Sequence, residues 1–230
     1  MRLAVFDYGA GNLHSLGKAL CAPGIDVSIE TDPAALLSAD CIVLPGVGAF
    51  GTAASRLAPA RAALATALGA GLPCLGICLG MQLLFDSSDE SPGVLGLGVI
   101  SGRVTRLRAS RVPHMGWNAV AWSKFAGCRV ASRNDPESLD GSSTPSVLES
   151  HFLASEASDA KRPSEPDVAY FAHSYACRPT DERVVTAWTV EDGDRFPSAV
   201  RWRNVVGVQF HPEKSSAPGV RFIRELLGAL

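Results

Sequence analysis

Short apolar runs recur through the first third of the chain, and segments that can form helices separate them. Four such runs cover residues 3–6, 27–29, 41–44 and 72–77. They are too short for core helices, and their lack of alternating polar residues is typical of strands buried on both faces. Strands and helices in repeated order predict an α/β fold, with a mostly parallel sheet covered by helices on both faces.

The segments between these runs carry helical signals. Residues 13–20 have apolar residues at helical spacing, and the alanine-rich residues 53–68 predict a second helix, which Pro59 is expected to kink or break. A further helix is expected to start at Pro33, because proline is favoured in the first turn. Residues 79–85 predict a helix directly after the fourth strand.

The second half of the chain has a different pattern. Strand-like runs cover residues 99–107, 169–175, 184–190, 198–202 and 205–210. Because the gaps between several of these runs are short, we expect antiparallel strand pairs added to the first sheet. Residues 217–227 predict a closing helix.

One stretch, residues 132–167, is rich in Ser, Asp, Glu and Pro and has little periodicity. Such composition is typical of a polar surface insertion. The chain has 230 residues, which suits one domain. We therefore expect a single domain over residues 1–230, with a polar insertion at about residues 132–167.

The overall composition excludes several classes of protein. The net charge is only −2, so there is no electrostatic reason to expect a nucleic acid or an anionic membrane as a partner. The first apolar stretch ends at Asp7, too soon for a signal peptide, and no run approaches the roughly 20 residues of a membrane span. The six cysteines form no C-x-x-C pair. We expect a soluble, cytoplasmic protein in a reducing compartment.

The sharpest local signal is the run GICLG at residues 76–80. It has the form of a nucleophile elbow, in which a tight strand-to-helix turn exposes one side chain at the edge of a sheet. Cys78 stands where hydrolases often have serine, and a helix N-terminus favours the reactive thiolate. A buried structural cysteine is the alternative, and we assign that role to Cys74, which lies within the strand.

A thiolate nucleophile needs a base and a group that orients the base. Of the five histidines, His211 is best placed, because it follows the apolar run 205–210 and so lies at a strand end. Glu213 can accept a hydrogen bond from its imidazole and fix the tautomer. Taken alone, the local pattern favours a solvent-exposed His-Pro-Glu turn over a catalytic role for His211.

The run PGVGAF at residues 45–50 also follows an apolar strand, so its backbone N–H groups can serve an oxyanion at the same sheet edge. The glycines near residue 10 do not form a dinucleotide site, because His14 stands where the third glycine is needed. Cys78, His211 and Glu213 could bind a metal by ligand type, but the zinc spacing is absent. We expect no metal and no cofactor.

Together, the runs 45–48, 76–82 and 209–213 resemble those of the class I glutamine amidotransferases. The resemblance implies a flavodoxin-like fold and a triad of Cys78 as nucleophile, His211 as general base and acid, and Glu213 as orienting group. Its other implied site residues are the oxyanion donors Val47 and Leu79 and the glutamine contacts Gly48, Gln82, Ser174 and Tyr175.

Three further runs, at residues 7–13, 113–118 and 170–175, narrow the resemblance to the glutaminase subunits of imidazole glycerol phosphate synthase. Met81 fits, because anthranilate-type glutaminases usually have histidine there. This resemblance implies a (β/α)8-barrel cyclase as partner, which uses the ammonia to make imidazole glycerol phosphate and aminoimidazole carboxamide ribotide in histidine biosynthesis. The implied interface residues are Asn12, Met115, Trp117, Tyr170 and Lys214.

Three alternatives remain open at this point. The chain could be a glutaminase subunit for anthranilate or aminodeoxychorismate synthesis, with the same triad. It could be a flavodoxin-like binding protein without activity, in which Cys78 is inert. It could also be a stand-alone cysteine hydrolase, fully active without a partner. The identity of the partner and the dependence of glutamate release on it distinguish these possibilities.

Overall fold

The computed structural model describes residues 1–9, 13–123 and 164–229, so most of the predicted insertion lies outside the described residues. The strands are β1 (Arg2–Phe6), β2 (Asp26–Glu30), β3 (Cys41–Leu44), β4 (Cys74–Ile77), β5 (Phe85–Ser88), β6 (Ile100–Arg106), β7 (His114–Ala119), β8 (Ala121–Trp122), β9 (Val168–His173), β10 (Tyr175–Pro179), β11 (Val185–Glu191), β12 (Asp194–Trp202) and β13 (Val205–Val208). The helices are α1 (His14–Leu20), α2 (Phe50–Leu57), α3 (Arg61–Gly69), α4 (Leu79–Leu83) and α5 (Ser216–Ala229). Among the helices described, none is long and apolar enough to cross a membrane.

The main sheet has eight strands in the order β2-β1-β3-β4-β13-β12-β11-β8. The first five strands are parallel, and the last three extend the sheet with antiparallel neighbours. The parallel order, 2-1-3-4 followed by the last strand of the chain, is the flavodoxin-like order. The predicted α/β fold with a mostly parallel sheet and added antiparallel strands is therefore confirmed.

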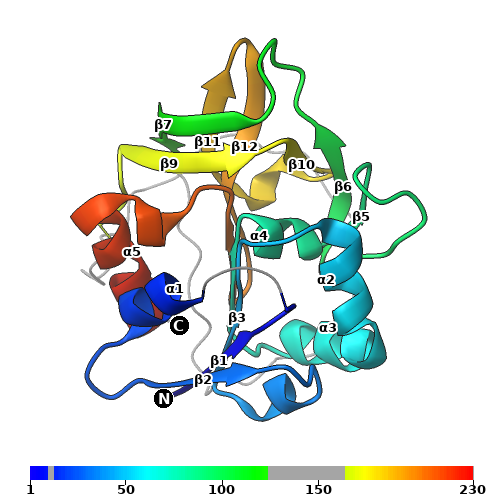
Figure 1. Ribbon diagram of the computed structural model, residues 1–230, viewed down its shortest axis with the longest axis vertical. Coiled ribbons are helices and arrows are strands. Elements are labelled where there is room, and N and C mark those ends of the chain that lie inside the picture. Colours follow the sequence, from blue (N-terminus) through cyan, green and yellow to red (C-terminus); the bar gives the residue numbers. More distant parts are fainter. Residues whose placement is uncertain (10–12, 124–163, 230) are drawn as a thin grey trace, which may run out of the picture.

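Helices cover both faces of the parallel strands (Figure 1). Alternate residues of β1 point to opposite faces. Leu3 and Val5 pack in one core cluster with residues of α1 and α5, whereas Ala4 and Phe6 pack in another with residues of α2 and α3. All four side chains are buried. The apolar runs in the sequence lack polar alternation because neither face of these strands meets water.

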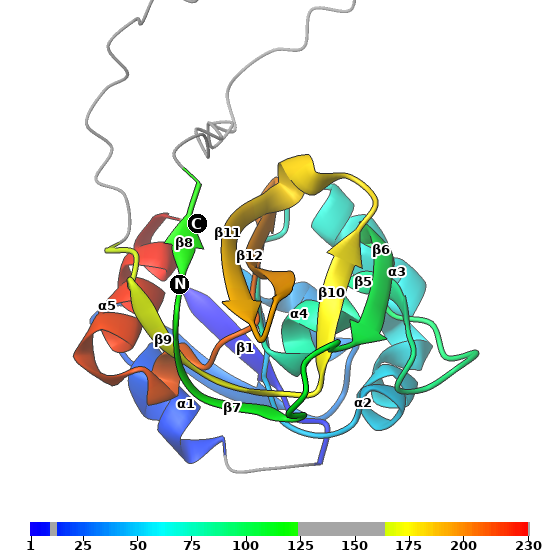
Figure 2. The same cartoon turned by 90° about the horizontal axis from the view of Figure 1, so that it is seen from above.

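Not all of the later strands join the main sheet, so that part of the prediction is wrong. β5, β6 and β10 form a separate three-stranded sheet, and β7 pairs with β9 in a two-stranded sheet. The run 169–175, expected as one strand, is two strands that part at Ser174, because β9 pairs with β7 and β10 with β6. Figure 2 shows β7 and β9 side by side across the end of the molecule.

Two of the helix predictions need adjustment, and a third is confirmed. The helix expected from Pro33 is only a 3₁₀ turn, Ala35–Ser38. The helix expected over residues 79–85 ends at Leu83, because Phe85 begins β5 and pairs with Ile100. The expected break at Pro59 is confirmed, since a 3₁₀ turn separates α2 from α3 there.

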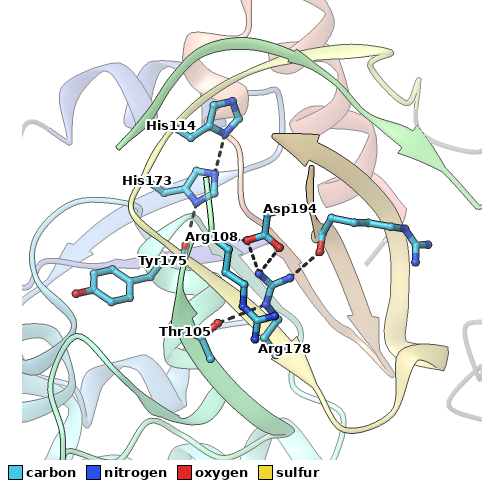
Figure 3. A network of polar contacts seen from close by, with 8 residues as sticks. Thr105, Arg108, His114, His173, Tyr175, Arg178 and Asp194 are labelled. Carbon is cyan, nitrogen blue, oxygen red and sulfur yellow. Dashed lines mark hydrogen bonds and ion pairs between the residues drawn. The ribbon is translucent and has the colours of Figure 1, made fainter. Parts of the chain in front are cut away.

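An ion pair fixes the three-stranded sheet against the main sheet. The Arg178 guanidinium on β10 donates two hydrogen bonds to the Asp194 carboxylate on β12, at 2.7 and 2.8 Å. It also donates to the Thr105 hydroxyl on β6 (Figure 3). Both bonds to Asp194 come from Nη2, while Nη1 donates to the Arg195 carbonyl at 2.6 Å, so the guanidinium is anchored to β12 through two of its nitrogens. Tyr175, at the start of β10, is thereby held near the carboxyl end of β4.

Candidate active site

Cys78 occupies the tight turn between β4 and α4. Its backbone has φ 47° and ψ −102°, which is a strained conformation for a residue with a side chain. The flanking glycines explain how the turn fits. A Cβ on Gly80 would lie 1.9 Å from the Leu44 carbonyl oxygen, and one on Gly76 would lie 2.7 Å from the Gly80 backbone. The GICLG run therefore encodes both the turn and its packing against β3.

The structure brings His211 and Glu213 to the same sheet edge as Cys78. The imidazole Nδ1 of His211 lies 2.9 Å from Oε1 of Glu213, and the His211 side chain is buried while that of Glu213 is 9% exposed. The backbone of His211 is also fixed, because its N–H donates to the Tyr170 carbonyl at 2.8 Å. The buried hydroxyl of Ser215 donates to the His211 carbonyl and accepts from the Tyr170 N–H. The imidazole is thus held from two neighbouring segments.

Two histidines lie close to Cys78, and their surroundings shift their pKa values in opposite directions. Burial lowers the pKa of His211, but hydrogen bonds to Cys78 and Glu213 and the charges of both groups outweigh it and raise the pKa to about 10. Burial lowers the pKa of His173 to about 3. Of these two rings, only that of His211 therefore holds a proton near neutral pH, which is the property expected of an acid–base group.

A pocket of about 290 Å³ opens beside Cys78. The residues expected to contact a substrate, Gly48, Gln82, Ser174 and Tyr175, all line it, as does Leu79 at the start of α4. Val47, the other expected oxyanion donor, is half-buried, and the pocket wall in that loop comes from its neighbours Gly46 and Gly48. A Cβ on Gly46 would lie 2.9 Å from both Cys78 and His211, so this loop packs directly on these two side chains.

Two ionisable residues of the pocket, Glu90 and His173, were not among the site residues predicted from the sequence. The half-buried Glu90 lines the pocket, and its carboxylate accepts a hydrogen bond from the Phe50 N–H at the start of α2, at 3.0 Å. Nothing in its local pattern distinguishes it from a solvated glutamate. His173 also lines the pocket, and its position in the run 170–175 was the only available signal.

Four of the five residues expected at a partner interface are described by the structure, and they lie on β7, on β9 and in the 3₁₀ turn Pro212–Lys214. Met115 and Trp117 on β7 are 66% and 54% exposed, although both are large and apolar. Tyr170 on β9 packs edge-on against Trp117, with ring centroids 6.1 Å apart. Lys214, directly after Glu213, is exposed. Asn12 lies outside the described residues.

The other cysteines of the described residues are free thiols, and three of them have core positions. Burial raises the pKa of Cys41 to about 12, and it also raises the pKa values of Cys74 and Cys177. These thiols are therefore poor nucleophiles. Within residues 1–9, 13–123 and 164–229, no group of three or more His, Cys, Asp or Glu side chains is arranged to hold a metal.

Comparison with known structures shows the same fold. A crystal structure of a glutamine amidotransferase superposes with a TM-score of 0.65 at 18% identity, with 98% of each chain covered. The structure of PurLQS from Thermotoga maritima gives a TM-score of 0.60 at 18% identity, with 99% of this chain and 98% of that chain covered. Identity this low supports the fold alone.

Comparison of sequences is more specific. Imidazole glycerol phosphate synthase subunit HisH of Pyrococcus furiosus is 40% identical over 223 residues, which cover 97% of this chain and 96% of the relative. The subunit of the same name from Methanothermobacter thermautotrophicus is 37% identical, with 98% and 97% covered. The profile of the family described as glutamine amidotransferase class-I matches residues 4–227. The chain therefore belongs to the class I glutamine amidotransferases, a family of enzymes.

Proposed function

We propose that the chain is the glutaminase subunit of an imidazole glycerol phosphate synthase, acting in histidine biosynthesis. The observation that carries the proposal is the strained Cys78 elbow beside the hydrogen-bonded His211–Glu213 pair, in a chain that matches two HisH subunits over nearly their whole length. The three side chains have the arrangement that a cysteine nucleophile, its acid–base group and an orienting carboxylate require.

In the first half of the proposed reaction, the thiolate of Cys78 attacks the side-chain amide carbon of glutamine. His211 holds a proton in this ion pair, because its pKa is about 10. As the carbon–nitrogen bond breaks, the imidazolium gives that proton to the leaving nitrogen, and ammonia departs. A γ-glutamyl thioester remains on Cys78. Glu213 keeps the imidazole oriented and stabilises its positive charge.

In the second half, water attacks the thioester carbon while the neutral His211 accepts a proton from that water. The carbon–sulfur bond then breaks, glutamate is released and the thiolate–imidazolium pair is restored. Each half passes through a tetrahedral oxyanion, which needs N–H donors. We assign these donors to Leu79, in the first turn of α4 where N–H groups lack intrahelical acceptors, and to Val47.

The pocket offers groups that complement free glutamine. Nε2 of Gln82 donates to the Tyr175 carbonyl at 3.0 Å and to Oε1 of Gln209 at 3.4 Å. Both of its hydrogens are therefore engaged, and its Oε1 is the atom that can accept from the α-ammonium group. Glu90 adds a negative charge to the same pocket. Gly48, Ser174 and Tyr175 complete the proposed contacts with the substrate.

We propose that the partner is a (β/α)8-barrel cyclase, which binds the surface formed by Met115, Trp117, Tyr170 and Lys214. Exposed aromatic and methionine side chains of this kind are typical of the centre of a protein interface. The cyclase would combine the ammonia with a phosphoribulosyl formimino aminoimidazole carboxamide nucleotide. The products are imidazole glycerol phosphate and aminoimidazole carboxamide ribotide. Asn12, outside the described residues, remains part of this proposed interface.

Replacing Trp117 by alanine is expected to weaken binding of the cyclase roughly 30-fold, the effect of losing about 2 kcal/mol at an interface hot spot. Isothermal titration calorimetry with the purified cyclase measures this change. Ile29→Ala is the matched control, because Ile29 is 56% exposed but lies on β2, an edge strand of the main sheet, whereas Trp117 lies in the separate β7–β9 sheet. If both substitutions weaken cyclase binding equally, or if neither weakens it, the interface lies elsewhere.

The pH dependence of glutamate release tests the role of Glu213. Burial alone lowers the pKa of His211, and Glu213 is one of the groups that raise it to about 10. In Glu213→Gln the raising charge is lost, so the imidazolium loses its proton at lower pH. The alkaline limb of the kcat/KM profile is then expected to move down by roughly one to three pH units.

The control for this profile is Glu182→Gln, which removes the same charge from an exposed residue in a 3₁₀ turn before β11. Its profile is expected to match that of the unaltered protein. An unchanged alkaline limb in Glu213→Gln would show that this carboxylate does not hold the proton on His211.

The proposed function is tested by glutamate release from glutamine, measured for the chain alone and with the cyclase and its nucleotide. We expect a rate that depends on Cys78 and rises sharply with the liganded cyclase. One reason is that the loop around Val47, flanked by glycines, is expected to align its oxyanion donor only when the partner binds. Equal rates with and without the cyclase would point to a stand-alone hydrolase or to another pathway.

The proposal also includes the organisation and location of the chain. We infer a single domain over residues 1–230, because strands from both ends of the chain, β1 to β4 and β11 to β13, share the main sheet. The stretch 132–167 remains a predicted insertion. We also propose that the protein works in a reducing compartment such as the cytoplasm, as expected for a chain whose cysteines form no C-x-x-C pair.

A further inference from the structure

A buried amide lies next to the sulfur of Cys78. Gln209 follows β13 and is completely buried, with its backbone N–H bonded to the Ser198 carbonyl at 2.9 Å. Its side-chain Nε2 lies 3.5 Å from Sγ of Cys78. Polar side chains are seldom buried without a partner, and sulfur is the partner on this side. Besides His211, the proposed nucleophile therefore has an amide side chain beside it, and no part of the reaction described above uses that amide.

Hydrogen bonding on the other side of this amide fixes which end faces the sulfur. The Tyr175 carbonyl can only accept, so the Gln82 side chain must present its NH2 group there, at 3.0 Å. The second hydrogen of that NH2 group is directed to Oε1 of Gln209, at 3.4 Å. Gln209 must then present its own NH2 group to Cys78. The reverse orientation would set two NH2 groups against each other.

Two histidines, His114 on β7 and His173 on β9, continue this series of hydrogen bonds and fix its donor-to-acceptor direction (Figure 3). Nδ1 of His173 lies 2.9 Å from the Tyr175 carbonyl and must be a donor there. Because burial lowers the pKa of His173 to about 3, its ring is neutral and Nε2 is left as an acceptor. Nδ1 of His114 lies 3.1 Å from that Nε2 and donates to it. Two donors therefore hold the Tyr175 carbonyl in place.

We propose that Gln209 is a catalytic residue, whose side-chain N–H donates to the sulfur of Cys78 and stabilises the thiolate. A donor favours the charged form of a buried acid. The thiol has a different contact available, since Sγ lies 3.8 Å from the Ala172 carbonyl, to which an S–H group could donate. When the proton moves to His211, that longer contact is lost and the Gln209 contact strengthens.

The role differs from substrate binding. Gln209 is fully buried behind Cys78, so it does not contact glutamine in the pocket. Loss of its N–H should lower kcat while KM changes little, because only the reactivity of the sulfur is affected. The inference deepens the proposed glutaminase function and rests on it. Its test can nevertheless be made without glutamine, on the thiol itself.

The test measures alkylation of Cys78 by iodoacetamide over a pH series, quantified at this residue by mass spectrometry because other thiols also react. Gln209→Met keeps the length of the side chain but removes the donor. Gln209→Glu keeps the shape and the acceptor for Gln82, and places a negative charge by the sulfur. In both, the pH of half-maximal alkylation rate should rise by about one to two units, with the larger rise in Gln209→Glu.

Ser198→Ala is the matched control, because Ser198 is equally buried and adjoins Gln209 through the backbone. Its alkylation profile should match that of the unaltered protein. If either Gln209 variant folds and alkylates with the unaltered profile, the proposal is overturned. If the profiles shift but no variant or unaltered protein releases glutamate, the proposed glutaminase function fails while the contact with the thiolate stands.

Discussion

Replacing Cys78 by alanine should lower the rate of glutamate release by roughly four to six orders of magnitude, the range seen when a nucleophile that acts together with its base is removed. The physical reason is that no thioester can form. His211 and Glu213 retain their buried contact in this variant, but the acid–base pair then has no nucleophile to serve. A steady-state assay for glutamate with the liganded cyclase present measures the change.

The matched control for this variant is Cys74→Ala. Cys74 is fully buried on β4, four residues before Cys78, and burial raises the pKa of its thiol. Its loss removes a core sulfur without touching the elbow, so the rate should stay close to that of the unaltered protein. A Cys78→Ala variant that retains substantial activity would mean that another group attacks the amide.

Replacing Gly46 by alanine should lower kcat by about 100-fold, although position 46 carries no reactive group. The added methyl group would lie 2.9 Å from Cβ of Cys78 and 2.9 Å from Cε1 of His211. These contacts are too short, so the two side chains must move apart. A shift of about 1 Å in a reacting group is enough for a loss of this size. Steady-state kinetics and thermal unfolding, measured together, separate this effect from misfolding.

Gly17→Ala serves as the control for the Gly46 substitution. Gly17 lies in α1, and a Cβ there would have no atom within 4 Å. The change should stabilise the protein by about 0.5–1 kcal/mol, because alanine is the better helix former, and leave kcat unchanged. Full activity in a folded Gly46→Ala variant would contradict the close packing of the loop on the triad.

The parallel core of the fold was predictable because its strands leave a strong trace in the sequence. β1, β3 and β4 are buried on both faces, so each appears as an uninterrupted apolar run. The elbow was predictable for a related reason. Its glycines are required by contacts under 3 Å with neighbouring backbone, which only a glycine tolerates. Where burial or close packing leaves a residue no alternative, the sequence carries the information.

β7 was not predicted as a strand because its polarity is inverted. His114 points inward and is buried, whereas Met115 and Trp117 point outward and are exposed. The usual rule that apolar residues face the core fails on such a strand, since its apolar face is available to a partner. The division of the run 169–175 at Ser174 was hidden as well, because strand pairing depends on neighbours far away in the chain.

The site was predictable as a set of residues but not as a geometry. The position of His211 after an apolar strand suggested it as the base, yet the local pattern alone favoured an exposed turn. The sequence does not show that the pKa values of His211 and His173 differ. Burial lowers the pKa of both rings, and only contacts with Cys78 and Glu213, which the fold creates, raise that of His211. The contact of Gln209 with the sulfur likewise depends on the packing of β13 beside β4.

The most direct test of the central claim is formation of imidazole glycerol phosphate by the cyclase complex, with glutamine or with an ammonium salt as nitrogen source. With the unaltered chain, both sources should support product formation. With Cys78→Ala, the ammonium salt should still support it and glutamine should not. Product formed from glutamine by the Cys78→Ala complex would contradict the proposed role of this protein as the source of ammonia. So would a failure of the unaltered complex to form product from glutamine.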